Sequence, residues 1–103
     1  MPRIIRPDPV PPMSVTIATR VFASEVLVGL IRYYGQNPGS QTEAAAALDL
    51  TTQLVSSNTR LLIDAGVVVE QEKGSGRRGG KYAVDKQRVR ELADALLRYS
   101  LGE

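Results

Sequence analysis

The chain has 103 residues, which suits one small domain, and its 43% hydrophobic content fits a globular protein rather than a disordered one. It contains no Cys and no His, so disulfides, zinc fingers, thiolate or imidazole metal sites and Cys or His nucleophiles are excluded. No carboxylates are grouped with a Gly-rich or nucleophile motif, no apolar run approaches the roughly 18–20 residues that span a bilayer, and the N-terminus lacks the apolar region of a signal peptide. We therefore expect a cytoplasmic protein that is not an enzyme and uses no cofactor, metal or membrane.

The net charge of +2 is unevenly distributed along the chain. Between Lys73 and Arg90 there are seven bases and one acid, Asp85, a net charge of +6 that leaves −4 for the remainder. Such a concentrated basic segment is expected of a nucleic-acid binder, although a solvated basic surface would have the same composition.

The N-terminal region divides into an arm and an ambiguous segment. Residues 1–13 hold five of the six prolines, which favour an extended arm outside the core. We expect a flexible tail or an arm that packs on a partner subunit, the alternative being that Arg3 and Arg6 enter a DNA minor groove. The domain proper is then residues 14–103, in which residues 15–17 favour a strand and residues 18–23 a helix.

A core helix is predicted from Glu25 to about Gly35. Ser24 precedes it as an N-cap, and Glu25 places a negative charge in the first turn. Apolar side chains then fall at helical spacing, namely Val26, Leu27, Leu30, Ile31 and Tyr34. The run Asn37-Pro38-Gly39 marks the turn that follows.

Two short helices joined by a tight turn are predicted next. Ser40 and Glu43 form the S-x-x-E capping box that begins the first helix, about residues 41–48. Asp49 occupies the turn, which needs a residue that tolerates the left-handed region. Thr51 is the expected N-cap of the second helix, residues 52–64, and Gly66 closes it.

The second of these helices has the composition expected of a helix that lies in a DNA major groove. Val55, Thr59 and Leu62 are expected to face the core. The opposite face then carries five side chains that can hydrogen-bond: Thr52, Gln53, Ser56, Ser57 and Arg60. Gln can pair with adenine and Arg with guanine, while Ser and Thr reach bases or phosphates, so we assign these five to base reading. A polar, solvated helix face is the alternative.

A β-hairpin with a basic loop is predicted after this helix. Residues 67–72 begin with three β-branched valines and form one expected strand, residues 81–84 form the second, and the loop KGSGRRGG lies between them. The loop lacks the spacing of a phosphate-binding P-loop. We interpret residues 74–80 as a projecting wing. The residues expected to hold the DNA backbone or minor groove, in the wing and outside it, are Ser40, Thr51, Arg77, Arg78 and Lys81.

Asp85 is the expected N-cap of a last helix, about residues 86–100, which carries a broad apolar stripe. A stripe this wide at the end of a small domain indicates a subunit interface, for which we name Val89, Leu92, Leu96 and Tyr99. The alternative is that the stripe packs back on its own chain.

The order of these predicted elements resembles that of a winged helix-turn-helix protein, and residues 21–100 are similar to bacterial transcriptional regulators of the ArsR/MarR type. The segment TEAAAALDLTTQLVSSNTRLLIDAGVV resembles the family pattern A-x-x-L-G-[LI]-S-x-x-T-V-S-x-x-L-x-x-L-x-x-A-G-[LI]-V, and VFASEVLVGLIRYY resembles its first core helix. The chain departs from this pattern at Asp49, where the family has Gly, and at Thr59, where it has Leu. It also lacks the Cys-x-Cys motif of the metal-sensing members.

The resemblance implies a mainly α fold with a small β-hairpin, arranged as a winged helix-turn-helix (α-α-turn-α-β-wing-β-α). The expected function is sequence-specific binding of double-stranded DNA by a homodimeric transcriptional regulator that acts as a repressor. The alternative is a winged helix that serves as a protein–protein interaction module, because a fold does not fix a function. Binding of single-stranded nucleic acid is a third option, disfavoured because few aromatic residues are available to stack on bases.

Overall fold

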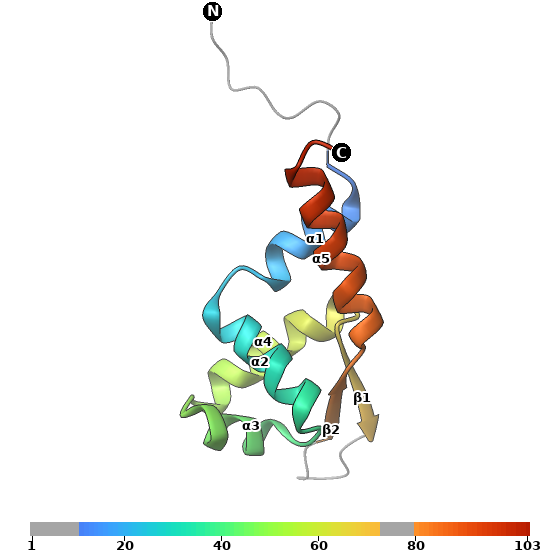
Figure 1. The fold of residues 1–103 in the computed structure, drawn as a ribbon. Coiled ribbons are helices and arrows are strands. Elements are labelled where there is room, and N and C mark those ends of the chain that lie inside the picture. Colours follow the sequence, from blue (N-terminus) through green and yellow to red (C-terminus); the bar gives the residue numbers. More distant parts are fainter. Residues whose placement is uncertain (1–10, 73–79) are drawn as a thin grey trace, which may run out of the picture.

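The computed structural model describes residues 11–72 and 80–103 of the chain. Within these ranges the chain forms five helices and one two-stranded antiparallel sheet (Figure 1). The elements are α1 (Met13–Val21), α2 (Glu25–Gln36), α3 (Gln41–Leu48), α4 (Thr52–Asp64), β1 (Val68–Glu72), β2 (Lys81–Val84) and α5 (Lys86–Ser100). The expected mainly helical fold with a small antiparallel sheet is thereby confirmed.

The ambiguous segment after the proline-rich arm is helical. Val15, Ala18 and Val21 are buried and recur every three residues, so a helix can bury all three on one face. This burial outweighs the strand preference of the β-branched residues at 15–17. Helices α1 and α2 are set at 92° to each other; among the described residues no single helix has the length and apolar composition to cross a membrane, and these two meet that criterion only when taken as one bent pair.

Each predicted N-cap is confirmed by a side-chain oxygen that accepts a backbone N–H three residues ahead. The four acceptors are Ser24 Oγ (from Leu27, 3.1 Å), Ser40 Oγ (from Glu43, 3.1 Å), Thr51 Oγ1 (from Leu54, 3.1 Å) and Asp85 Oδ1 (from Arg88, 3.0 Å). At Ser40 the capping box is complete, because the Ser40 N–H also donates to Glu43 Oε1 at 2.9 Å. These bonds satisfy N–H groups that a helix start otherwise leaves without a partner.

The turns also follow their local chemistry. Asp49, between α3 and α4, has φ 55° and lies in the left-handed region, as predicted for this turn residue. Gly66, which follows the C-cap residue of α4, has φ 79°, a conformation in which a side chain would be strained. Asp is one of the few non-glycine residues that adopt the left-handed conformation without a large penalty.

The sheet is joined to the helices by a short bridge. Val68 pairs with Val84 and Val69 with Ala83, and the register shifts between Glu70 and Glu72. Gly39, in the turn between α2 and α3, exchanges both backbone hydrogen bonds with Tyr82 of β2, at 2.7 and 3.0 Å. The turn before α3 is therefore held against the sheet by main-chain bonds that depend on no particular side chain.

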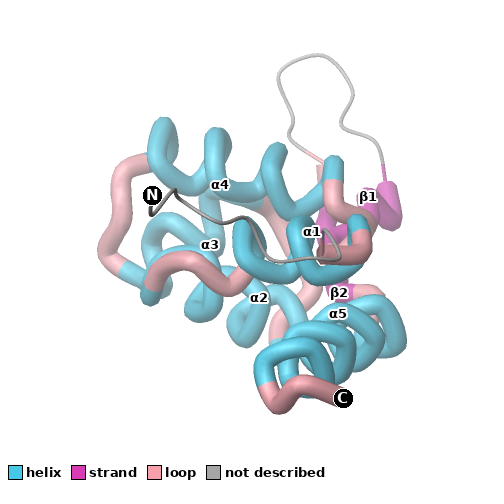
Figure 2. Tube along the Cα trace, turned by 90° about the horizontal axis from the view of Figure 1, so that it is seen from above, coloured by secondary structure: helices cyan, strands magenta, loops and turns pink. Residues whose placement is uncertain are grey.

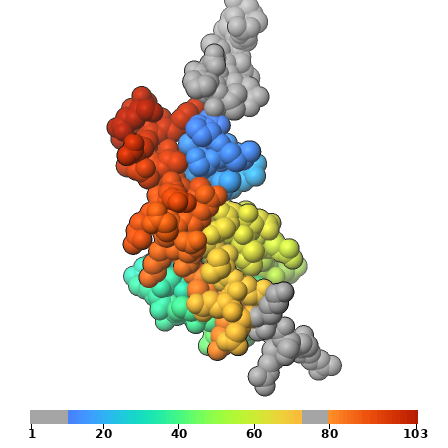
Figure 3. All heavy atoms as spheres, turned by 90° about the vertical axis from the view of Figure 1, so that its right-hand side faces the viewer, coloured from blue at the N-terminus to red at the C-terminus, as the bar shows by residue number. Residues whose placement is uncertain are grey.

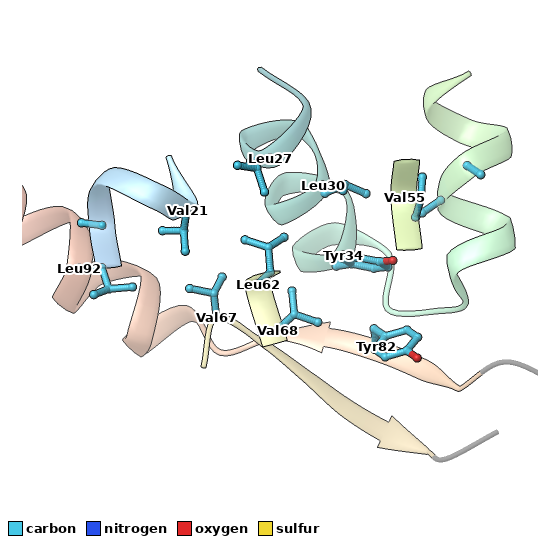
Figure 4. Close-up of a cluster of buried hydrophobic side chains, with 13 residues drawn as sticks. Val21, Leu27, Leu30, Tyr34, Val55, Leu62, Val67, Val68, Tyr82 and Leu92 are labelled. Carbon is cyan, nitrogen blue, oxygen red and sulfur yellow. The ribbon is translucent and has the colours of Figure 1, made fainter. Parts of the chain in front are cut away.

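The hydrophobic core lies where α1, α2, α4 and β1 meet, and all of these elements contribute to one cluster (Figure 4). Its fully buried members with the largest side chains are Tyr34, Leu30, Leu62, Leu92, Val21, Val55, Val67 and Val68. Thr59 is the one buried polar side chain among the described residues, and its hydroxyl lies 3.0 Å from the hydroxyl of Tyr34. The core is thus tied by one hydrogen bond across α2 and α4.

Helices α1 and α5 pack side by side at one end of the molecule, above the group formed by α2, α3, α4 and the sheet (Figures 1 and 3). Leu92 of α5 is completely buried in this contact. In the first turn of α5, Arg88 donates from Nε to the carbonyl oxygen of Ala65 at 3.0 Å. Ala65 is the C-cap of α4, where carbonyl groups lack helical partners, so Arg88 joins the end of α4 to the first turn of α5.

Candidate nucleic-acid interface

Helix α4 lies along one outer side of the molecule (Figure 2). Its inner face is anchored by Val55, Thr59 and Leu62, each 0% exposed. On the opposite face all five side chains that we assigned to base reading are exposed: Thr52, Gln53, Ser56, Ser57 and Arg60. The division between core and solvent faces predicted from the sequence is therefore confirmed, while the reading of bases stays a prediction.

The start of α4 is held in place by its neighbours. The Asp49 turn is closed by a hydrogen bond of 2.9 Å from the Leu50 N–H to the Ala45 carbonyl, and Leu48 and Leu50 on either side are half-buried against the core. Thr51 then caps α4 with its own hydroxyl. The first turn of α4, which would enter a groove first, is thus positioned by contacts with α3.

The exposed side chains of α4 are largely free of other contacts within the described residues. Ser57 Oγ donates to the carbonyl oxygen of Leu54 in its own helix at 3.1 Å. Arg60 takes part in no ion pair with the residues that the structure describes. Thr52, Gln53, Ser56 and Arg60 can therefore form hydrogen bonds to a ligand without first breaking bonds to the described part of the protein, whereas Ser57 would have to release Leu54 in order to donate.

Two hollows flank α4, and Arg60 lines both. One, of about 380 Å³, lies between α1 and α4 and is lined by Ile17, Arg20, Val21, Ser57, Arg60, Leu61, Asp64 and Ala65. The other, of about 290 Å³, is lined by Gln41, Ser56, Arg60, Ile63, Glu70 and Tyr82. The exposed face of α4 is thus continuous with surfaces of α1, α3 and β1.

These hollows identify two polar residues that the sequence analysis missed, Arg20 and Gln41. Arg20 is exposed in the last turn of α1, and nothing in its sequence context indicates that α1 lies beside α4. Gln41 is the first residue of α3. Its place next to the predicted N-cap Ser40 was a signal that could have identified it as a residue of this surface. Asp64 also lines the first hollow, one turn after Arg60, and adds a negative charge there.

The residues predicted to contact the DNA backbone differ in their exposure and in whether the structure describes them. Thr51 and Lys81 are exposed and Ser40 is half-buried, and all three already have partners within the chain. The Ser40 and Thr51 oxygens accept the capping bonds, and Lys81 Nζ lies 3.5 Å from Glu72 in an ion pair. Arg77 and Arg78, with the rest of the predicted wing tip, lie outside the described residues, so that assignment stays a prediction.

The electrostatics of α3 follow from its capping box. The Ser40 backbone N–H, and secondarily the Ser40 hydroxyl, lower the pKa of the Glu43 carboxyl below its usual value. Glu43 is accordingly ionised at neutral pH in the first turn of α3, where its negative charge is attracted by the positive end of the helix dipole.

The predicted interface residues of α5 are partly used within the chain. Leu92 is 0% exposed, and Val89, Leu96 and Tyr99 are half-buried, with α1 packed against this side of the helix. The large apolar side chains of α5 that remain exposed lie elsewhere, at Leu97 and just beyond the helix at Leu101.

Within residues 11–72 and 80–103 no group of three or more His, Cys, Asp or Glu side chains is arranged to hold a metal ion. A scan against known protein families gives no matching family model, and no curated protein matches the sequence.

Proposed function

We propose that this protein binds double-stranded DNA through α4 and acts as a transcriptional regulator of the winged helix-turn-helix type, working as a homodimer that represses by occupying its site. The observation that carries the proposal is the outer face of α4. Five side chains able to hydrogen-bond to bases are exposed there, on a helix whose inner face is locked into the core.

The arrangement around α4 supports this function. A reading helix must present its side chains in a fixed orientation, because misplaced groups lose the geometry of base pairing. Helix α4 is fixed at its start by Thr51 and the Asp49 turn, and at its end by Arg88. Arg20 and Gln41, on either side, are suitably placed to contact phosphates along the same groove.

The composition of this face favours DNA over a protein partner. Protein interfaces are typically anchored by exposed aromatic or large apolar side chains. On α4 the one such residue is Leu54, which is 39% exposed, beside Thr, Gln, Ser and Arg. The other large apolar residues that are exposed in the described chain lie on or next to other elements, namely Met13, Val28, Val69, Leu97 and Leu101.

The test is selection of bound duplexes from a random DNA pool with the purified full chain. We expect enrichment of a motif with two related halves, separated by about one helical turn of 10–10.5 base pairs if each subunit reads one half. The double variant Gln53→Ala/Arg60→Ala serves as the matched control and should lose or change the motif while keeping the fold. Absence of any enriched motif with the wild-type chain would refute DNA reading and favour the protein-interaction alternative.

A further inference from the structure

Two carboxylates lie beside Arg60, and neither has a role in the proposed contacts with DNA. Asp64 is the last residue of α4 and lines the hollow between α1 and α4 together with Arg20 and Arg60. Glu70 of β1 lines the hollow on the other side of α4, again together with Arg60. A surface that binds a polyanion is expected to avoid such groups, because a carboxylate repels phosphate. Their position next to a base-reading arginine therefore requires an explanation.

Asp64 continues the line of exposed residues on the outer face of α4. Four exposed residues follow one another at intervals of four, three and four positions and so form one row along the helix: Gln53, Ser57, Arg60 and Asp64. The N-terminal part of a reading helix contacts the bases, so its far end lies closer to the DNA backbone. Asp64, at that far end, would therefore lie nearer to phosphates than to bases.

Asp64 does not stabilise the helix that carries it. The C-terminal end of a helix dipole is negative, so a carboxylate in the last turn lowers the stability of the helix. No basic residue lies in the last turn of α4, and Asp64 takes part in none of the ion pairs among the described residues. Arg88, which donates to the Ala65 carbonyl at the same helix end, pairs with Glu91 at 3.8 Å. An exposed Asp at this position is thus better explained by its effect on a ligand than by a contribution to the fold.

The charges in the hollow between α1 and α4 limit how much phosphate it can hold. Arg20 and Arg60 contribute +2 and Asp64 contributes −1, which leaves a net charge of +1. That balance suits one phosphate, which the proposed interface assigns to Arg20, and disfavours a second at Arg60. Without Asp64 the net charge would be +2, and Arg60 could leave the bases for the backbone of any duplex.

Glu70 places a second carboxylate on the other side of Arg60. It pairs with Tyr82 across the sheet, and both residues line the hollow that Arg60 also lines. A glycine at position 80 leaves room for this carboxyl, because a side chain at Gly80 would collide with the Glu70 carboxyl and with the Glu72 carbonyl oxygen. Gly80 therefore lets the Glu70 carboxyl stay at this end of the sheet.

We propose that Asp64 and Glu70 determine specificity by keeping phosphate away from Arg60. A complex with an unrelated duplex is held by phosphate contacts alone, whereas the correct site also offers base edges, whose acceptors carry only partial charges. A carboxylate that opposes phosphate contact therefore weakens the unrelated complex more than the correct one, and an unfavourable contact of this kind improves discrimination. The proposal rests on the proposed function, because it assigns the reading of bases to Arg60.

The experiment compares Asp64→Asn with the wild-type full chain by fluorescence anisotropy, using a duplex enriched by the wild-type chain and a scrambled duplex. Removal of the carboxylate should raise the affinity for the scrambled duplex about 3- to 5-fold, the effect of one repelling charge near a phosphate in water. The affinity for the enriched duplex should rise less, so the preference falls. For the scrambled duplex the slope of log K against log salt concentration should become steeper by about 0.9, because Arg60 gains one phosphate.

Asp94→Asn is the matched control, since it makes the same change of side chain and charge on α5, where Asp94 pairs with Arg98 at 2.9 Å. It should leave the preference unchanged. Glu70→Gln should act in the same direction as Asp64→Asn. In an Arg60→Ala background, Asp64→Asn should no longer steepen the salt dependence, because the guanidinium that would gain the phosphate is absent. Urea unfolding should show that Asp64→Asn is at least as stable as wild type, so that unfolding does not explain a lost preference.

The results separate this proposal from the reading of DNA by α4. If the wild-type chain enriches a motif and both carboxylate variants equal it in preference and salt dependence, the role of the carboxylates is refuted and the reading helix stands. If the wild-type chain enriches no motif, the proposed function is refuted; tighter and more salt-dependent binding of the scrambled duplex by Asp64→Asn then still supports exclusion of phosphate. Weaker binding of the scrambled duplex by both variants, or no binding by any of the three proteins, overturns the proposal.

Discussion

At the scale of single residues, Thr59 shows how a polar side chain can occupy a core position. The resemblance suggested an apolar Leu at this core position, and a hydroxyl there would be costly if it had no partner. The structure pairs it with the buried hydroxyl of Tyr34 at 3.0 Å. The two polar residues are therefore explained together, and this long-range pair could not be predicted from either local sequence.

Removal of one member of this pair should be more costly than removal of both. Thr59→Val keeps the shape but leaves the Tyr34 hydroxyl buried without its partner, and we expect a loss of about 1–3 kcal/mol in the free energy of unfolding. Tyr34→Phe should cost less, because a helical Thr can donate to the carbonyl four residues earlier. Urea unfolding of the two single variants and the double variant measures the coupling.

The double variant tests whether the hydrogen bond couples Tyr34 to Thr59. If the hydrogen bond links the two sites, Tyr34→Phe/Thr59→Val is more stable than the sum of the single losses predicts. Tyr33→Phe, at the half-buried neighbour of Tyr34, is the control and should be nearly neutral. Strict additivity of the two single losses would contradict the coupling.

Tyr34 also illustrates the effect of burial on a titratable group. Burial raises the pKa of its hydroxyl, and the hydrogen bond to Thr59 offsets this only in part. The phenol is therefore protonated throughout the range in which the protein would bind DNA and contributes no charge to the core.

At the scale of secondary structure elements, the sequence predicted best where the determining chemistry is local. Ser24, Ser40, Thr51 and Asp85 each carry the oxygen that caps the helix they precede, so the starts of four helices could be recognised from a few adjacent residues. The last helix was predicted with the same bounds, 86–100, as those observed.

Adjacent residues did not determine the secondary structure of α1 or the packing of α5. Residues 15–17 have strand-forming side chains, and the helix is favoured by burial of Val15, Ala18 and Val21, largely through packing on the distant α5. The apolar stripe of α5 was recognised, but the sequence does not tell which side packs on α1 and which stays exposed. Arg20 was missed for the same reason, because its position beside α4 depends on tertiary packing.

The capping box of α3 predicts a dependence of stability on pH. The folded state lowers the pKa of Glu43 below the 4.5 of an unperturbed carboxyl, so its stabilising contribution is complete above pH 4.5 and is lost as the pH falls through the lower folded value. Gln can also fill the third helical position of a capping box but does not ionise. The advantage of wild-type protein over Glu43→Gln should therefore shrink between pH 5 and about pH 3, as measured by urea unfolding at each pH.

This result can be compared with a direct titration. Nuclear magnetic resonance of the Glu43 carboxyl carbon should give a pKa below 4.5, in the direction that hydrogen bonding from Ser40 to this carboxyl imposes. A stability difference between the two proteins that does not change with pH would mean that the ionised form of Glu43 contributes nothing to α3.

At the scale of the whole molecule, the polar hollows beside α4 and the apolar hollows beside Phe22 lie on different elements. Helix α4, with its flanking residues from α1 and α3, presents polar and basic groups, and Asp64 and Glu70 add acidic ones. The hollows beside Phe22 are lined by residues of α2 and α5, and Glu25 is the one charged residue that lines them among the described residues. Because α1 packs on α5 and lines a hollow with α4, it connects the two regions.

This division predicts that two arginines on adjacent helices affect DNA binding differently. Arg60, on the outer face of α4, is assigned to base edges, so Arg60→Ala should reduce the preference for the selected duplex over a scrambled one by about 1–3 kcal/mol. Arg20, at the edge of the same hollow, is suited to a phosphate. Arg20→Ala should weaken binding to both duplexes equally. It should also reduce the magnitude of the slope of log K against log salt concentration by about 0.9.

Fluorescence anisotropy with both duplexes at several salt concentrations separates the two effects. Arg98→Ala is the control, because Arg98 is paired with Asp94 at 2.9 Å in the last turn of α5, at the end of the molecule away from α3 (Figure 1). It should change neither the preference nor the salt dependence. An Arg60→Ala variant that keeps the full preference would remove Arg60 from base reading, whereas loss of preference in Arg20→Ala would place a base contact on α1. The salt dependence also applies to the predicted wing, since loss of Arg77 and Arg78 should lower it without altering preference if both contact phosphates.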